Sequence, residues 1–282
     1  MEGLRKQRAA LEALATTLES MEEDARIATR ELQSGAQTTR EFVKALQQEN
    51  QLSLEHEKPL VVMLASSSKW RRALISQILP EGMVLADDPI SPDIDEKAIR
   101  RDEPEEMVKA IAHAKADKVL SILSNPASTR KGPTIDIVIC ADQVVCYGDQ
   151  VREKPITEAQ AREHLQSYGA TRTPAKCITG LVVAVPATLA RIEGTDVALQ
   201  YFKRVPDRVA DALIAKGDIM YCAGSFVVED PLLTPYLDER VGEIESVQGM
   251  PKELTRKLLI QAARDLRKHL KERGGSKRHK KE

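Results

Sequence analysis

Three short, mainly apolar runs limit what this chain can fold into more than any other feature of its sequence. They are LVVMLA at residues 60–65, IDIVICA at 135–141 and ITGLVVAV at 178–185. Apolar runs of this length are typical of strands that are buried on both faces of a sheet. Amphipathic helical patterns separate and follow these runs, over residues 70–79, 107–123, 157–168, 205–215 and 252–270. Strands that alternate with helices predict an α/β domain with a central sheet.

Residues 1–57 have a different pattern from the rest of the 282-residue chain. Apolar residues from Leu4 to Leu32 recur at alternating steps of three and four, with charged residues between them, which predicts an a/d seam on a long helix. A Ser-Gly pair interrupts the seam, and a weaker helical pattern resumes at Phe42. We expect either a coiled coil that forms a homodimer or binds a partner protein, or a helical hairpin that folds onto the next domain.

The charge balance argues against a polyanionic partner. The chain has 42 basic and 43 acidic residues, a formal net charge of -1, so we expect no stable binding to nucleic acid and none to an anionic membrane. The exception is KERGGSKRHKKE at residues 271–282, a cationic run without apolar period. We predict a disordered tail there, with nuclear localisation or RNA contact as the alternative. The predicted parts are therefore a helical extension over 1–57, an α/β domain over 58–270 and this tail.

The sequence also carries expectations about the protein's compartment. No stretch approaches the about 20 apolar residues that a transmembrane helix needs, and the N-terminus lacks the apolar core of a signal peptide. Cys140, Cys146, Cys177 and Cys222 show no metal-ligand spacing, so reduced thiols are the default. We therefore expect a cytoplasmic protein.

The segment LASSSKWRRALI at residues 64–75 combines the features of a phosphate-binding loop. The first predicted strand leads there into a serine-rich turn, and the turn leads into a helix. Backbone N–H groups at the helix start, the hydroxyl groups of Ser66 and Ser68 and the guanidinium group of Arg71 all offer hydrogen bonds to an anion. The alternative is that Ser68 only caps the helix and that the basic side chains are solvated.

Three further segments place charged residues where an α/β enzyme would use them. PDIDE at 92–96 puts carboxylates on a turn, CADQ at 140–143 ends a predicted strand with Asp142, and EKP at 153–155 adds Lys154 before a proline. Strand ends are the usual location of functional residues in open α/β sheets. Carboxylates near phosphate-binding cations suggest a divalent metal ion and an activated water. Each segment also has an ordinary interpretation, as a turn cap, a strand end or surface charge.

Together, these stretches resemble the Maf-like nucleoside triphosphate pyrophosphatases over residues 60–270. The similarity rests on LASSSKWRRALI, PDIDE, AHAKADKV, ICADQVV, the KPIT segment, CITGLVV, YCAGSF and QGMP, in this order. It implies a Maf/inosine-triphosphatase-like mixed twisted sheet, flanked by helices, with a central cleft. It also implies hydrolysis between the α- and β-phosphates of a nucleoside triphosphate, to the monophosphate and pyrophosphate, with a divalent cation such as Mg²⁺ or Mn²⁺.

The resemblance implies roles for individual residues. Asp142 would accept the proton of the attacking water, and Asp95 would lie near the metal ion. The phosphates would be bound by Ser66, Ser68, Arg71, Lys115 and Lys154. These residue types agree with the chemistry, because cleavage of a phosphoanhydride needs a general base and neutralisation of charge.

Within the family, the sequence is most similar to the branch that hydrolyses 7-methyl-GTP rather than dTTP and UTP. Trp70 precedes paired arginines, Gln143 follows Asp142, and Phe226 follows an Ala-Gly-Ser stretch. Glu229 stands where that branch carries its specificity glutamate. N7-methylguanine is cationic, and a cation stacks most strongly on an indole ring. A carboxylate can accept hydrogen bonds from the guanine N1–H and amino groups. In the alternative interpretation, Trp70 is an anchor in the domain core.

The sequence departs from the family pattern at three places. Glu153 stands where a glycine is usual, Lys69 replaces a proline, and DPLLTPYLDER replaces a glycine-rich turn after Glu229. Two alternative functions therefore stay open. One is a dTTP/UTP pyrophosphatase of the same fold, and the other is a non-catalytic nucleotide-binding scaffold that acts through residues 1–57.

Overall fold

The structure is a computed structural model that describes residues 58–125, 130 and 132–278. The predicted helical extension over residues 1–57, with its coiled-coil interface, lies outside the described residues, as does the end of the basic tail at 279–282. Among the helices that are described, none is long and apolar enough to cross a membrane.

The domain is built on one mixed sheet of seven strands, which confirms the predicted fold class. In chain order the strands are β1 (Leu60–Leu64), β2 (Met83–Leu85), β3 (Ile137–Tyr147), β4 (Gln150–Arg152), β5 (Ala175–Val185), β6 (Ala190–Phe202) and β7 (Leu237–Val241). Across the sheet they follow the order β2-β1-β3-β5-β6-β7, and β4 pairs with β3. β1 is parallel to β2 and β3, whereas the other pairs are antiparallel.

The three apolar runs become β1, β3 and β5, but β3 is longer than the sequence predicts. Asp142 does not end this strand, which continues to Tyr147. The reason is a change of neighbour: β1 pairs with β3 only as far as Ile139, β4 pairs with it from Val145, and β5 pairs along its whole other side. Residues 140–144 therefore form an edge of β3 between β1 and β4, and Asp142 lies on this edge.

All five predicted helices are present. The helices are α2 (Lys69–Ile78), α3 (Pro104–Ser124), α4 (Glu158–Ser167), α5 (Asp207–Lys216), α6 (Ile244–Val247) and α7 (Lys252–Arg278). Short 3₁₀ turns are η1 (Glu96–Ala98), η2 (Asp218–Tyr221), η3 (Ala223–Ser225) and η4 (Thr234–Tyr236). The sequence did not predict α6 or the 3₁₀ turns, which are too short to show a helical period.

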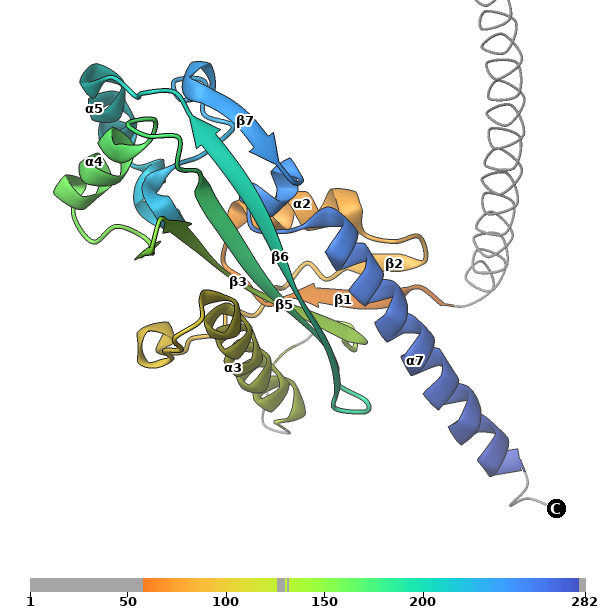
Figure 1. The fold of residues 1–282 in the computed structure, drawn as a ribbon. Coiled ribbons are helices and arrows are strands. Elements are labelled where there is room, and N and C mark those ends of the chain that lie inside the picture. The colour runs from red at the N-terminus through yellow and green to blue at the C-terminus, as the bar shows by residue number, and fades with distance from the viewer. Residues whose placement is uncertain (1–57, 126–129, 131, 279–282) are drawn as a thin grey trace, which may run out of the picture. The chain divides into compact units, whose positions relative to one another are not determined.

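Helices cover both faces of the sheet (Figure 1). Val62 and Leu64 of β1 pack in one cluster with α2 and α7, whereas Val61 and Met63 pack in another cluster with α3. Successive side chains of a strand point to opposite faces, so a strand between two helical layers must be apolar throughout. This explains the uninterrupted run in β1.

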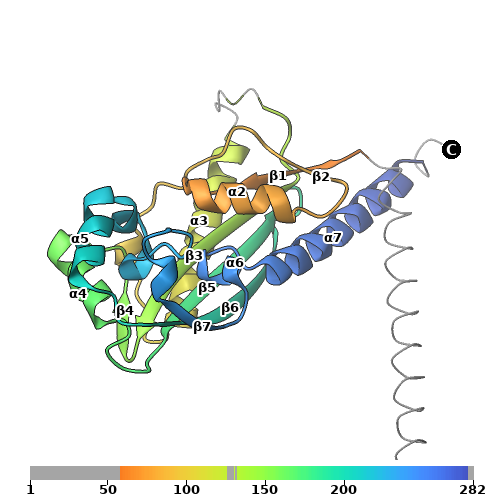
Figure 2. The same cartoon turned by 90° about the horizontal axis from the view of Figure 1, so that it is seen from above.

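The far end of the sheet carries an aromatic cluster in an otherwise aliphatic protein. Figures 1 and 2 show α4 and α5 together at this end, opposite the C-terminal end of α7. Tyr168 stacks on Phe202 with ring centroids 4.7 Å apart, and Phe226 meets both rings edge-on. Tyr168 also donates a hydrogen bond of 2.8 Å to the carbonyl oxygen of Gly224. The cluster therefore contacts the segment 222–228 through Gly224 and Phe226.

Helix α7 ends at Arg278, within the segment that the sequence predicts as a disordered tail from residue 271. Its apolar side chains pack on the sheet from Leu258 to Leu266. The C-terminal part of α7 extends past the strands (Figures 1 and 2). Lys, Arg and Glu favour helix intrinsically, which accounts for the helix up to residue 273, whereas Gly274 and Gly275 do not favour it.

Candidate active site

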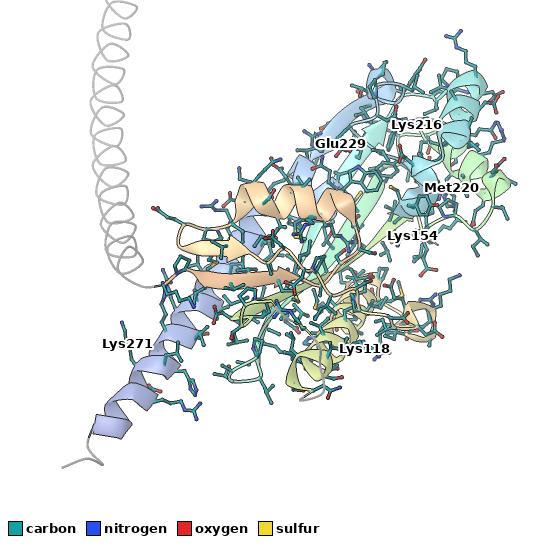
Figure 3. All side chains as sticks on the ribbon, turned by 180° about the vertical axis from the view of Figure 1, so that it is seen from behind. Lys118, Lys154, Lys216, Met220, Glu229 and Lys271 are labelled. Carbon is teal, nitrogen blue, oxygen red and sulfur yellow. The ribbon has the colours of Figure 1, made fainter. Side chains whose placement is uncertain are left out.

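A cavity of about 450 Å³ opens beside the free edge of β3. Six parts of the chain line it: the turn between β1 and α2, the segment before η1, the middle of α3, β3 itself, the segment after β4, and residues 218–229 with 247–248. Figure 3 labels Lys154 and Glu229, which reach the cavity from two of these parts. A cavity of this size, lined by both apolar and charged groups, is suited to a small-molecule ligand.

The turn between β1 and α2 presents hydrogen-bond donors to the cavity. The Ser68 hydroxyl accepts from the backbone N–H of Arg71 at 3.3 Å and caps α2. The Ser66 hydroxyl accepts from the backbone N–H of Ser68 at 3.1 Å. Both serines line the cavity, and the first turn of α2 contains no acidic residue. Ser68 is thus a cap, as the alternative interpretation held, but the capped helix start still faces the cavity with its positive dipole end.

Of the paired arginines, Arg71 lines the cavity and Arg72 turns away from it. The Arg71 Nη1 donates to the carbonyl oxygen of Ala141 at 3.0 Å, on the free edge of β3. The Arg72 Nη2 donates instead to the carbonyl oxygen of Ala86 at 2.9 Å. Burial lowers the pKa of Arg71, while the negative charges of Asp142 and Glu96 oppose this effect. Arginine keeps its charge even in such surroundings, so Arg71 offers a fixed cation to an anionic ligand.

Lys115 connects the acidic groups of the site. Its Nζ donates to the Asp142 Oδ1 at 2.7 Å and to the carbonyl oxygen of Ala141 at 3.3 Å, and it lies 2.9 Å from the Glu96 Oε1. Lys115 and Asp142 are buried, with 5% and 6% exposure. Buried charges persist only when they are paired and hydrogen-bonded. One ammonium group and two carboxylates are therefore held together beside the free edge of β3. The Asp142 carboxylate is buried, and Glu96 lines the cavity.

The carboxylates present here fit a hard divalent cation in part. The Asp95 carboxylate accepts from the backbone N–H groups of Lys97 and Ala98 at 3.1 and 3.2 Å and caps η1. The next residue, Glu96, lines the cavity instead. Within the described part of the chain, no cluster of three His, Cys, Asp or Glu side chains forms a complete metal site. Mg²⁺ needs only one or two protein carboxylates when substrate phosphates and water complete its shell, and of the two acids in this segment Glu96 is the one that reaches the cavity.

Lys154 reaches the cavity from the exposed segment that follows β4. The residue before it, Glu153, replaces the usual glycine and pairs with the Arg100 Nη2 at 3.2 and 3.3 Å. Its carbonyl oxygen accepts from the N–H of Gly224 at 3.3 Å. The substitution at Glu153 thus adds an ion pair between this segment and the one that contains η1.

The cavity is also lined by Trp70, Val247, Gln248 and Glu229. Trp70 is only half-buried and belongs to none of the core clusters, so it is not the core anchor of the alternative interpretation. The Gln248 Nε2 donates to the Glu229 Oε1, which orients this carboxylate. The lining therefore includes an aromatic ring and an exposed acid.

Gln143 fixes α6 beside the site. Its Nε2 donates to the carbonyl oxygens of Ser246 and Val247 at 2.9 and 3.2 Å. Gly249 has a φ of +84°, and a Cβ atom there would lie 2.7 Å from the Gln143 Oε1 and 3.3 Å from the Arg71 Nε. Glycine is therefore required at position 249 for both its backbone conformation and this close approach.

The structure brings nearly all predicted site residues together. Those that line the cavity are Ser66, Ser68, Trp70, Arg71, Lys115, Gln143, Lys154 and Glu229. Asp142 joins them through its hydrogen bond to Lys115, whereas Asp95 is outside the lining. The sequence did not single out Glu96, Asp218 or Tyr221, which also line the cavity. Glu96 belongs to the PDIDE segment, but the sequence alone does not show that Asp95 caps η1 and that Glu96 lines the cavity.

The fold is α/β, and its cavity gathers Arg71, Lys115 and Lys154, which are side chains suited to an anionic ligand. Residues 61–262 match the family described as Maf-like protein, and the chain belongs to this family. It is 39% identical over 206 residues to a 7-methyl-GTP pyrophosphatase from Dictyostelium discoideum, a match that covers 73% of this chain and 98% of that relative. These findings confirm the predicted family and enzyme class.

Two further relatives carry other substrate names. A nucleoside triphosphate pyrophosphatase from Thermosynechococcus vestitus is 30% identical over 202 residues, which cover 70% of this chain and 91% of the relative. A dTTP/UTP pyrophosphatase from Anaeromyxobacter dehalogenans is 28% identical over 204 residues, which cover 71% of this chain and 93% of the relative.

Proposed function

We propose that the protein hydrolyses the α–β phosphoanhydride of 7-methyl-GTP, or of a closely related modified nucleotide, to the nucleoside monophosphate and pyrophosphate. The observation that carries this proposal is the buried Asp142 carboxylate, which accepts a hydrogen bond from Lys115, a residue that lines the cavity together with Arg71. A general base beside fixed cations is the arrangement that phosphoanhydride hydrolysis requires. The names of the relatives from Dictyostelium discoideum and Thermosynechococcus vestitus support it.

In the proposed mechanism, Asp142 accepts a proton from a water molecule. The oxygen of this water forms a bond to the α-phosphorus, and the bond from the α-phosphorus to the bridging oxygen breaks. Pyrophosphate leaves with the electron pair of that bond. Lys115 keeps Asp142 in place through the 2.7 Å hydrogen bond, and Arg71, Lys154 and the start of α2 bind the phosphate oxygens.

A divalent cation such as Mg²⁺ or Mn²⁺ would neutralise the charge of the phosphates. We propose Glu96, rather than the capping Asp95 alone, as the acid of this segment that would hold the cation together with phosphate oxygens, because Glu96 is the one that lines the cavity. Its Oε1 is 2.9 Å from the Lys115 Nζ, which keeps it near Asp142.

The base would bind against Trp70 and Glu229, which both line the cavity. N7-methylguanine carries a positive charge, which favours stacking on the indole ring. Glu229, oriented by Gln248, can accept hydrogen bonds from the guanine edge. The 39% identity to the 7-methyl-GTP pyrophosphatase supports this substrate. A dTTP/UTP pyrophosphatase is the second candidate, supported by the 28% identical relative with that name.

A nucleotide panel tests the proposal. Purified full-length protein is given 7-methyl-GTP, GTP, dTTP and UTP with Mg²⁺ or Mn²⁺, and pyrophosphate release is measured. We expect the highest kcat/KM for 7-methyl-GTP, and in ¹⁸O-labelled water we expect the label in the monophosphate. Preference for UTP or dTTP would favour the second candidate. Nucleotide binding without any release of pyrophosphate would instead favour the scaffold function.

A further inference from the structure

Tyr221 is an unusually exposed aromatic residue. Its exposure is 73%, and it lines the same cavity as Trp70. The whole chain contains only five Tyr, three Phe and one Trp. The described rings of the cluster around Tyr168 contact each other face to face or edge to face, whereas the Tyr221 ring is exposed beside the cavity. An exposed ring beside a cavity is available for a ligand to stack on.

The local backbone explains why the ring points to the cavity. Helix α5 is capped at its C-terminus by Gly217, whose φ is +85° and whose N–H donates to the carbonyl oxygens of Leu213 and Ile214. The turn η2 follows at once. A 3₁₀ helix has three residues per turn, so side chains at i and i+3 lie above one another. Asp218 and Tyr221 therefore share one edge of η2, and both line the cavity.

The other side of η2 is anchored in the core. Ile219 is 1% exposed and packs in the cluster around Tyr168. The backbone N–H of Met220 donates to the carbonyl oxygen of Gly217, and that of Cys222 donates to Ile219, at 3.1 and 3.2 Å. Met220, labelled in Figure 3, marks the position of this turn. The backbone below Tyr221 is thus fixed, and the ring can be removed without a loss of core packing.

Lys216 connects η2 to the segment that contains Glu229. Its Nζ lies 2.5 Å from the Asp230 Oδ2 and 3.8 Å from the Asp218 Oδ2. Asp230 is buried and also accepts from the N–H of Leu232 at 2.9 Å. Lys216 and Glu229 are both labelled in Figure 3. Asp230 is the first residue of the segment DPLLTPYLDER, which departs from the family pattern. Through Lys216 it links this segment to Asp218 of η2.

We propose that Tyr221 is a specificity-determining residue that stacks on the nucleotide base, with Asp218 on the same turn favouring a base that carries a positive charge. The inference rests on the proposed function. Trp70 of α2 and Glu229 line the cavity. Tyr221 and Asp218 of η2 line it as well, so these segments contribute two rings and two acids. Rings and carboxylates together recognise organic cations, because the ring faces and the acids both carry negative potential.

Substitution of Tyr221 tests the inference through turnover. We expect Tyr221→Ala to lower kcat/KM for 7-methyl-GTP about tenfold, since one base–aromatic stack is worth roughly 1–3 kcal/mol, and to lower it less for GTP and UTP. Tyr221→Phe should keep the parent values. Leu189→Ala is the matched control, because Leu189 is 69% exposed at the turn between β5 and β6 and does not line the cavity. It should change none of the three.

A binding measurement separates the two proposals. Trp70 is the single tryptophan, so its fluorescence reports on the cavity. The products 7-methyl-GMP and GMP are titrated into the parent protein, Tyr221→Ala and Tyr221→Phe. We expect Tyr221→Ala to weaken 7-methyl-GMP binding about tenfold and to reduce its preference over GMP. If the parent prefers 7-methyl-GMP and Tyr221→Ala keeps that preference and affinity, the Tyr221 inference is wrong. If the parent itself shows no preference, the proposed substrate is wrong.

Discussion

Removal of Lys115 tests whether the charges at the free edge of β3 form one unit. Lys115 and Asp142 are almost fully buried and are joined by a 2.7 Å hydrogen bond. Loss of one partner from a buried ion pair costs about 3–5 kcal/mol, because the other charge stays buried without compensation. Glu96 is 44% exposed at its side chain and adds little, since water screens it. We therefore expect Lys115→Met to lower the free energy of unfolding by about 3 kcal/mol.

A double-mutant cycle in urea measures this coupling. Asp142→Asn removes the other charge, and Lys115→Met with Asp142→Asn should cost less than the sum of the two single changes, by about 1–3 kcal/mol. Lys118→Met is the control on the same helix, because Lys118 is exposed (Figure 3) and its loss should stay within about 0.5 kcal/mol. Additivity of the two changes within about 0.5 kcal/mol would refute the coupling between Lys115 and Asp142.

Three further tests concern the site and its support. Trp70→Ala should lower kcat/KM for 7-methyl-GTP about tenfold and affect UTP less, and equal losses would contradict stacking. Gly249→Ala and Gly148→Ala should each lose about 1–2 kcal/mol of stability because both have positive φ, but only Gly249→Ala should slow turnover, since nothing lies near Gly148. Burial lowers the pKa of His164 below its ordinary value of 6.5. Its neutral form therefore stabilises the fold fully above about pH 6.5, and this contribution is lost as pH falls through the folded pKa. His164→Asn should show a smaller drop in Tm between about pH 7.5 and about pH 5.5 than the parent, and an equal drop would contradict this account.

The sequence predicts the fold well where burial dictates residue type. β1, β3 and β5 lie between two helical layers, and their apolar runs show it. The sequence did not predict β6 and β7, because both strands have exposed positions that carry polar side chains and so lack a continuous apolar run. The extent of β3 beyond Asp142 depends on which strands lie beside it, and such pairing between distant segments is not visible in a local pattern.

Some residues of the candidate site could likewise be predicted from the sequence, and others could not. Ser66, Arg71 and Lys154 stand in continuous stretches whose residue types already indicate phosphate binding. The difference between Asp95 and Glu96 could not be predicted, because both are acids on one turn and only the 3₁₀ geometry decides which caps the backbone. Tyr221 was missed for a related reason, since its direction depends on how α5 ends.

The most direct test of the account is single-turnover hydrolysis of 7-methyl-GTP by the parent and by Asp142→Asn, with Mg²⁺ in excess and nucleotide binding followed in the same samples by Trp70 fluorescence. Asn keeps the size of the side chain and removes its ability to accept the proton from water. We predict that the variant stays folded, binds the nucleotide and releases no pyrophosphate on the timescale of the parent reaction. Pyrophosphate release at the parent rate would contradict the central claim that Asp142 activates the water.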